Sequence, residues 1–332
     1  NDAALTEGVF LEIAPDANID QTLHIVWVTA IRDSAFSINQ RLLAICGANS
    51  RARIVEHFAS AGGERVARET ATPQSFTNGI TELLLQGGAR LEHYRLHLEE
   101  AGAMHVGGVH AHLGSDATLE SFHLALGSAL KRIEVAVAHR GQGAHCELSG
   151  VYLPRGSEHV DYHTCVEHAL PRCTTNEVFS GIVADQARAV FKGSIHIHPG
   201  AQQTRAELSN RNLLTSAGAE VNTKPELEIY ADDVQCAHGA TVARLDAGMM
   251  HYLRTRGVGR EEAEVMLKAA VCLEALGEYP QARSGFKEVL ATMPESFDAH
   301  LGMARLQYRE GQFDQLVDNC RRIRSLPLDE PP

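Results

Sequence analysis

Residues 116–138, DATLESFHLALGSALKRIEVAVA, contain the clearest indication of the fold. It contains two short runs of alternating apolar residues, 118–126 and 131–138, separated by small residues. Alternation with a period of two predicts β-strands, and Gly, Ser or Asp between such runs predicts the bends that join them. Similar runs occur at residues 80–85, 91–98 and 189–198. We therefore predict that residues 1–246 form one strand after another.

A short turn motif recurs along this region: a small residue or Asp, then Ala, then any residue, then an apolar residue. It starts at residues 16, 88, 116, 143, 218 and 239, and from residue 88 the starts are 28, 27, 75 and 21 residues apart. We interpret the gap of 75 as three coils. Short strands at a repeat of roughly 20–28 residues, without long amphipathic helices between them, indicate a solenoid such as a parallel β-helix. Its aliphatic core and tight turns would account for 5% aromatic residues and 28 glycines. The alternative is a β-sandwich.

The composition changes after residue 246, where residues 249–256 and 260–276 have a helical pattern. Three residues recur 34 positions later: Ala270, Gly277 and Tyr279 return as Ala304, Gly311 and Phe313. A period of 34 is typical of the tetratricopeptide helix–turn–helix repeat. We predict a helical C-terminal domain over residues 247–332, with repeats at 263–296 and 297–330. Two ordinary helical hairpins are the alternative.

Charge and composition exclude several classes of function. Lys and Arg number 30 against 42 Asp and Glu, and a net charge of −12 argues against nucleic-acid or anionic-membrane binding. Seven cysteines without a CxxC pair indicate neither a disulfide framework nor a zinc finger, and favour a reducing compartment. There is no long apolar run, and the first residues do not resemble a signal peptide. Without a P-loop, GxSxG or GxGxxG motif, we predict a non-catalytic protein that does not hydrolyse ATP.

The most informative motif lies in residues 222–246, NTKPELEIYADDVQCAHGATVARLD. Cys236 and His238 are two positions apart, so on a strand they project from the same face. A thiolate and an imidazole are soft or borderline ligands suited to Fe, Zn or Cu(I). Because two ligands do not complete a site, we expect the others to come from elsewhere in the fold or from another subunit.

This motif resembles the SufB/SufD family, scaffold subunits of the SUF iron–sulfur cluster assembly machinery, and is most similar to the SufD members. The resemblance rests on residues 224–234 (KPELEIYADDV) and 236–241 (CAHGAT), and covers roughly residues 5–270. It extends through residues 183–195, 201–206, 210–214 and 252–258.

The resemblance implies a right-handed parallel β-helix followed by an α-helical C-terminal domain. It implies two partners, a SufB-like subunit bound through the β-helices and a SufC-like ATPase bound through the C-terminal helices. It also implies a transient iron–sulfur cluster or iron at the subunit interface, with no cofactor held tightly by the isolated chain. The expected location is the bacterial cytoplasm, and the plastid stroma is also compatible.

The resemblance also assigns residues. His238 falls on the position of the family's interface ligand, and Cys236 is the second candidate. The stretch leading into the SufC-binding helices contains Tyr252, Arg254, Arg256 and Gly257. The sequence departs from the family in two ways, since an N-terminal helical domain is not expected here and the tetratricopeptide-like tail is unusual.

Two further functions remain open. One is a protein-interaction module that keeps the β-helix and has lost assembly activity. The other is a carbohydrate-cleaving β-helix enzyme that uses Asp232 and Asp233 as acids. That reading is disfavoured because adjacent strand residues point to opposite faces.

Several of the 18 histidines also suggest metal ligands. His110 and His112 share a strand face, as do His196 and His198, and each pair is a possible half-site. The stretch 161–165, with His168 and Cys173 after it, is a denser candidate for zinc. We interpret most of these histidines as turn, surface or coil residues.

Overall fold

The structure is a computed structural model, and it describes residues 7–29, 35–60, 75–244 and 279–292, with the single positions 303, 306, 307 and 315. The chain divides into two compact units, residues 1–243 and 244–332. Each unit is described by itself below.

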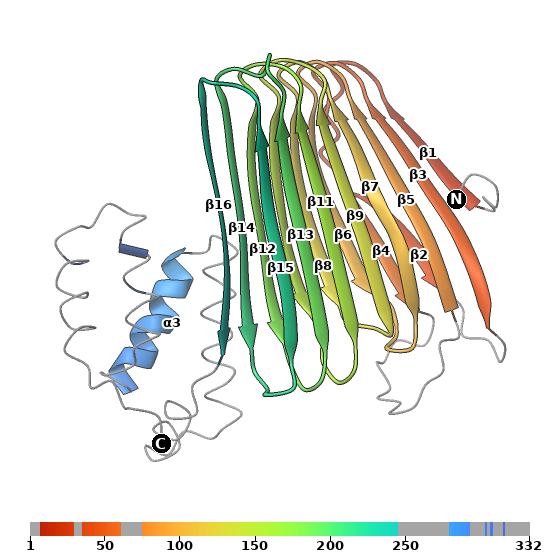
Figure 1. The fold of residues 1–332 in the computed structure, drawn as a ribbon. Coiled ribbons are helices and arrows are strands. Elements are labelled where there is room, and N and C mark those ends of the chain that lie inside the picture. Colours follow the sequence, from red (N-terminus) through yellow and green to blue (C-terminus); the bar gives the residue numbers. More distant parts are fainter. Residues whose placement is uncertain are drawn as a thin grey trace. The chain divides into compact units, whose positions relative to one another are not determined.

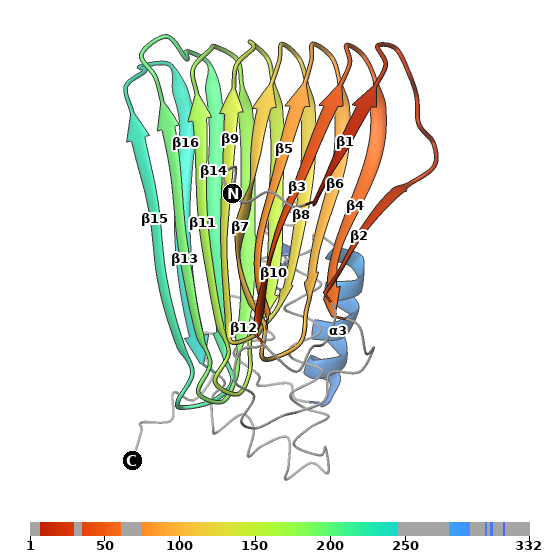
Figure 2. The ribbon, with the colours of Figure 1, turned by 90° about the vertical axis from the view of Figure 1, so that its right-hand side faces the viewer.

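The first unit is a parallel β-solenoid in which each coil contributes one strand to each of two sheets (Figures 1 and 2). In the described residues, one sheet contains the odd-numbered strands in order: β1 (Glu7–Ile13), β3 (Phe36–Cys46), β5 (Ser75–Leu85), β7 (Met104–Leu113), β9 (Leu130–His139), β11 (His159–His168), β13 (Arg188–Ile197) and β15 (Glu220–Ile229). The other contains the even-numbered strands: β2 (Leu23–Thr29), β4 (Arg51–Ser60), β6 (Arg90–Leu98), β8 (Thr118–Leu126), β10 (His145–Leu153), β12 (Thr174–Val183), β14 (Thr204–Leu214) and β16 (Val234–Arg244).

Neighbouring strands of each sheet run parallel, as the pairs β5–β7 and β6–β8 illustrate. The prediction of a mainly β parallel solenoid is confirmed, and the β-sandwich alternative is wrong. The right-handed sense of the coil stays a prediction.

The coils are not of equal length. Arg90, Thr118, His145, Thr174 and Arg205 lie in register on successive even strands, so these coils are 28, 27, 29 and 31 residues long. The turn motifs at residues 16, 88, 116 and 143 all lie between an odd strand and the next even strand. The motif at 218 lies at the opposite corner, between β14 and β15, and the one at 239 lies inside β16. Interpreting the gap of 75 residues as three coils was therefore wrong.

The corner that joins odd to even strands is built on stacked left-handed residues. One residue per coil has a φ between 56° and 71°: Asp16, Asn49, Gly88, Asp116, Gly143, Arg172 and Gln203. Each donates its backbone N–H to a carbonyl of the next coil, at N···O distances of 2.6–3.1 Å. Gly, Asn and Asp tolerate this conformation best, which explains why Gly or Asp opens the turn motif.

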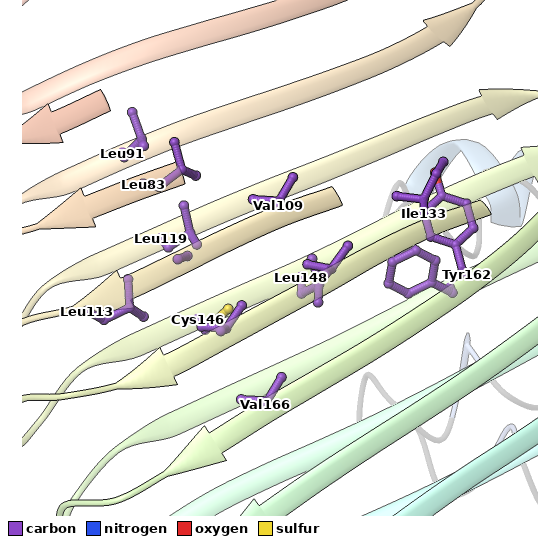
Figure 3. Close-up of a cluster of buried hydrophobic side chains, with 14 of the residues drawn as sticks. Leu83, Leu91, Val109, Leu113, Leu119, Ile133, Cys146, Leu148, Tyr162 and Val166 are labelled. Carbon is purple, nitrogen blue, oxygen red and sulfur yellow. The ribbon is translucent and has the colours of Figure 1, made fainter. Parts of the chain in front are cut away.

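The half of the interior next to this corner is aliphatic (Figure 3). Leu83, Leu113, Leu119, Leu148 and Val166 come from five different strands and are at most 1% exposed. Burying side chains of this size stabilises the fold by about 1.5–3 kcal/mol each. This is the core that the low aromatic content predicts.

The other half of the interior is polar and aromatic, which the sequence analysis did not predict. Arg95 and Lys131 are fully buried there, Arg95 close to the rings of Phe58 and Tyr162 and Lys131 beside Glu99. Four histidines of this half are also fully buried, namely His93, His97, His105 and His123, and two more, His139 and His168, are fully buried next to the odd-to-even corner. They are interior residues rather than turn or surface residues.

The second unit is described at α3 (Tyr279–Thr292) and at the four single positions. Pro280 lies in the first turn of α3, where its missing N–H costs no helical hydrogen bond. Ala282 and Phe286 are buried and four residues apart, so they share one face of the helix. The rest of the predicted helical domain and most of both repeats lie outside the described residues. Within the described part of the chain, no helix is long and apolar enough to cross a membrane.

Candidate functional site

Residues 222–244 of the motif that resembles the SufB/SufD family lie in the last described coil of the solenoid, which consists of β15 and β16. Each of these strands is the final one in its sheet among the described residues. β15 contains Pro225, which pairs in register with Gly193 of β13. Proline lacks an N–H and is confined mainly to edge strands. Pro225 therefore suits β15 to a position at the edge of its sheet.

Cys236 and His238 lie on β16, two residues apart, so strand alternation places them on one side. Cys236 is half-buried and packs against the core, so this is the inner side of the strand. His238 is exposed. Their different burial follows from their place in the last coil, because in the described residues no further strand covers β16.

The thiol of Cys236 is not activated in the isolated chain. Burial raises its pKa, and a hydrogen bond with the backbone of Ala206 opposes that effect only in part. A raised pKa keeps the thiol protonated, so metal binding would have to displace the proton. Among the described residues, neither Cys236 nor His238 belongs to a group of three potential ligands within 4.8 Å of one another. The described residues therefore supply two ligands at this position and no third.

The last coil also exposes large apolar side chains. Ile229, Tyr230 and Val242 are 41%, 59% and 46% exposed. The ring of Tyr230 packs against that of His196 in a tilted arrangement, at a centroid distance of 5.3 Å. Exposed apolar groups beside an unpaired strand edge are typical of a surface that another protein covers.

The residues that the resemblance assigns to ATPase binding, Tyr252, Arg254, Arg256 and Gly257, lie outside the described residues. Their role stays a prediction.

The two histidine pairs singled out in the sequence lie together on the outer face of the odd-strand sheet. His110, His112, His196 and His198 line one shallow groove of about 490 Å³ that also contains Cys165. His196 and His198 are tied to carboxylates, since His196 lies 3.1 Å from Glu228 and His198 lies 2.9 Å from Glu167. The pairs therefore share a surface, but they are not among the three-ligand groups found in the described residues.

A buried ionic network, absent from the sequence predictions, fills the polar half of the interior. Glu56 Oε2 lies 3.3 Å from Arg95 Nη1, 3.1 Å from His93 Nε2 and 2.8 Å from Thr81 Oγ1. Burial opposes the charge on Glu56, but Arg95 and His93 outweigh it and lower its pKa to about 2. Arg95 also donates to the carbonyl of Gly108 at 3.2 Å. The network is internally paired, so we regard it as structural.

A comparison with protein-family models identifies the solenoid. The model described as "SUF system FeS cluster assembly, SufBD core domain" matches residues 29–271. A tetratricopeptide-repeat model matches residues 273–315, which include α3. Both matches agree with the resemblances seen in the sequence.

Curated relatives support the same family. The chain is 34% identical to the iron–sulfur cluster assembly protein SufD of Escherichia coli over 225 residues, which are 68% of this chain and 51% of that protein. It is 28% identical over 282 residues to the SufBD family protein slr0076 of Synechocystis, covering 85% of this chain and 62% of that protein. It is 30% identical to the chloroplastic protein ABCI7 of Arabidopsis thaliana, over 65% of this chain and 47% of that protein. The chain thus spans about half to three fifths of the length of these relatives, and it belongs to the SufB/SufD family of iron–sulfur cluster assembly proteins.

Proposed function

We propose that this chain is a SufD-like, non-catalytic scaffold that holds a nascent iron–sulfur cluster at an interface with a SufB-like subunit. The observation that carries the proposal is the position of the Cys236–His238 motif on β16, the last strand of its sheet in the described residues. A partner strand added to that edge would lie next to both side chains. The cluster is cargo, shared between two subunits.

The chemistry of the last coil supports a shared site. A neutral imidazole and a thiolate both bind iron, and two ligands from one chain leave room for ligands from another. The exposed Ile229, Tyr230 and Val242 would supply apolar contact area around them. Strand addition would also satisfy the backbone groups along the edge of β16 that is unpaired in the described residues.

We further propose that a SufC-type ATPase binds the C-terminal unit and supplies ATP turnover. The proposed contact residues are Tyr252, Arg254, Arg256 and Gly257. The tetratricopeptide-repeat match at residues 273–315 favours an additional protein contact in this unit. We place the complex in the bacterial cytoplasm, and the relative named as chloroplastic makes the plastid stroma the second choice.

The test is co-expression of the full chain with SufB and SufC homologues and purification without oxygen. Iron, acid-labile sulfide and visible absorbance are then measured on the complex. We expect His238→Ala to lower cluster content strongly while leaving the complex assembled. The matched control is His110→Ala, which removes a histidine from the outer groove and should have no effect on cluster content.

The ATPase contact has its own test. The double variant Arg254→Ala/Arg256→Ala should lose SufC in a pull-down and retain SufB.

If the wild-type chain forms no complex, or if His238→Ala matures clusters normally, the scaffold proposal fails. A complex that forms but never gains iron or sulfide would instead support the interaction module.

A further inference from the structure

Two buried histidines interrupt a column of aliphatic side chains at the C-terminal ends of the odd-numbered strands. His139 ends β9 and His168 ends β11, and the two residues lie in register. The coil before them has Leu113 at the same position, and the coil after them has Ile197. All four side chains are at most marginally exposed. Two coils therefore place an imidazole where their neighbours place a hydrocarbon.

A cysteine faces this pair from the start of the even strands. Cys173 directly precedes β12, in the position that Ala144 and Ala117 occupy in the two preceding coils. Cys173 is fully buried. One ring nitrogen each of His139 and His168 and the Cys173 sulfur all lie within 4.8 Å of one another. Three borderline or soft ligands thus converge where apolar or small residues would be sufficient for packing.

Hydrogen bonding satisfies the cysteine of this cluster but not the two histidines, since the Cys173 thiol donates to the carbonyls of Gly141 at 3.3 Å and Pro171 at 3.6 Å. Nε2 of His139 and Nε2 of His168 each lie 3.0 Å from Oγ1 of Thr175. The Nδ1 atoms of both rings are buried without a hydrogen-bond partner. The Thr175 oxygen can accept an N–H from both rings, and that arrangement leaves an Nδ1 lone pair on each. A metal-bound histidine characteristically donates its other N–H to such an acceptor.

The electrostatics suit a cation. Burial lowers the pKa of His168 to about 4 and lowers that of His139 well below its usual range, so both rings are neutral and can act as ligands. Asp116 and His145 are the ionisable neighbours that act on Cys173 and His139 from adjoining turns. Burial raises the pKa of Cys173, so its thiol must lose its proton to bind a metal.

A second buried group, formed by His97, Glu99 and His105, shows the contrast. Its ligand atoms also lie within 4.8 Å of one another. However, Lys131 Nζ lies 2.9 Å from Glu99, and Arg95 donates to Nε2 of His97 at 3.2 Å. Two fixed cations already occupy the surroundings of that group, so it does not suit a metal ion.

We propose that His139, His168 and Cys173 form an internal binding site for one borderline divalent cation, of which Zn²⁺ fits best. Two imidazole nitrogens and one thiolate are a zinc ligand set, with a water as the fourth ligand and Thr175 as the acceptor of both ring N–H groups. Tetrahedral Zn²⁺ with these ligands separates its donor atoms by about 3.3–3.6 Å, so the three side chains would close by at most about 1.5 Å. On binding, the Cys173 sulfur loses its proton to solvent and forms the bond to the metal. This site is independent of the proposed cluster interface at His238.

The site lies beneath the two corner turns at residues 140–144 and 169–173. Because its ligands are fully buried, the metal enters when the corner opens or while the chain folds. The experiment therefore loads the metal during expression and again during refolding.

The test uses Co²⁺ as a spectroscopic substitute for Zn²⁺ in the full chain carrying Cys236→Ala, which removes the thiol of the surface motif. We expect one Co²⁺ per chain by elemental analysis, with the near-ultraviolet thiolate-to-cobalt absorption band. Zn²⁺ added to the apoprotein should raise the melting temperature and abolish the band.

The test variants replace each proposed ligand by the residue found at the same position in a neighbouring coil. Cys173→Ala, His139→Leu and His168→Ile each restore the residue type of a neighbouring coil, so folding is expected to persist. Each should abolish stoichiometric cobalt binding and the thermal shift. Thr175→Val should weaken binding by about 10–100-fold. The matched control, Cys165→Ala, removes an exposed thiol and should bind cobalt normally.

A wild-type band that survives in Cys173→Ala would overturn the proposal, as would a folded chain that binds no cobalt after both loading procedures. Neither result depends on whether the chain assembles clusters, because only the chain and the metal are used.

Discussion

Glu177 on β12 offers a quantitative test of the free-energy cost of ionising a carboxyl group in the interior of the solenoid. Its side chain is fully buried, and its Oε1 accepts a hydrogen bond from Thr164 Oγ1 at 2.5 Å. In the described residues no partner contacts Oε2. Burial therefore raises the pKa of Glu177 to about 7, although the Thr164 hydrogen bond opposes the shift.

The sign of the pH dependence follows from this shift. Between pH 4.5 and 7 the folded carboxyl retains a proton that the unfolded carboxyl has lost, so stability falls as the pH rises. At about 1.36 kcal/mol per pKa unit, the penalty is about 1 kcal/mol at pH 5 and about 3 kcal/mol at pH 8. Glu177→Gln keeps the Thr164 hydrogen bond and cannot ionise. Its stability relative to wild type should therefore improve by about 2–3 kcal/mol from pH 5 to pH 8.

The assay is urea unfolding of both proteins at pH 5 and pH 8, followed by far-ultraviolet circular dichroism. The matched control is Glu120→Gln on β8, whose side chain is exposed. Its stability should follow the wild type at both pH values. If the stability difference between Glu177→Gln and wild type is the same at both pH values, the reasoning about Glu177 is wrong.

Two further predictions concern buried charge and backbone contact. Arg95→Met removes the cation that neutralises the buried Glu56, and thermal or urea unfolding should show a loss of about 3–5 kcal/mol; a loss under about 1 kcal/mol would show that the network is not ionic. Gly107→Ala would place a methyl group 2.1 Å from the backbone oxygen of Gly79 in the adjacent strand, so it should cost about 1–3 kcal/mol or more. Gly200→Ala meets no atom within 4 Å and should stay within about 0.5 kcal/mol of wild type in the same experiment.

The strands were predictable because each carries the same local signal. Residues 118–126 alternate, and they form β8 with the predicted bounds. Stacking was also predictable, since the motifs at residues 88, 116 and 143 repeat with the length of one coil. The motif at 218 misled the count because both corners of a coil use the same small residues, and local sequence does not say which corner a turn occupies.

The buried charges were not predictable in the same way. In β6, His93, Arg95 and His97 face inward along with Leu91, so the inward face of that strand is largely polar. Its main counter-charge, Glu56, lies 39 residues earlier in another strand, and no local pattern connects the two. Alternation identifies which residues share a face, but not whether that face can be buried.

The candidate sites show the same limit. The spacing of Cys236 and His238 predicts a shared face, but their unequal burial depends on where the solenoid ends. The cluster around Cys173 depends on register, because His139 and His168 are 29 residues apart and meet only when successive coils are aligned. Aligning the sequence coil by coil would reveal it as two histidines in a column of leucine and isoleucine.

In the part of the chain that the structure describes, the outer edge of β16 has no partner strand, and such an edge affects a chain before it meets any partner. A solenoid is stabilised by contacts between nearest-neighbour coils, so its end coil has half the support of an inner one. An unpaired strand edge flanked by exposed apolar groups is a template for pairing with any extended chain, including a second copy of itself. Surplus chain is therefore expected to aggregate or to be degraded from this end. Cells that produce the protein would need to match its amount to that of whatever covers β16.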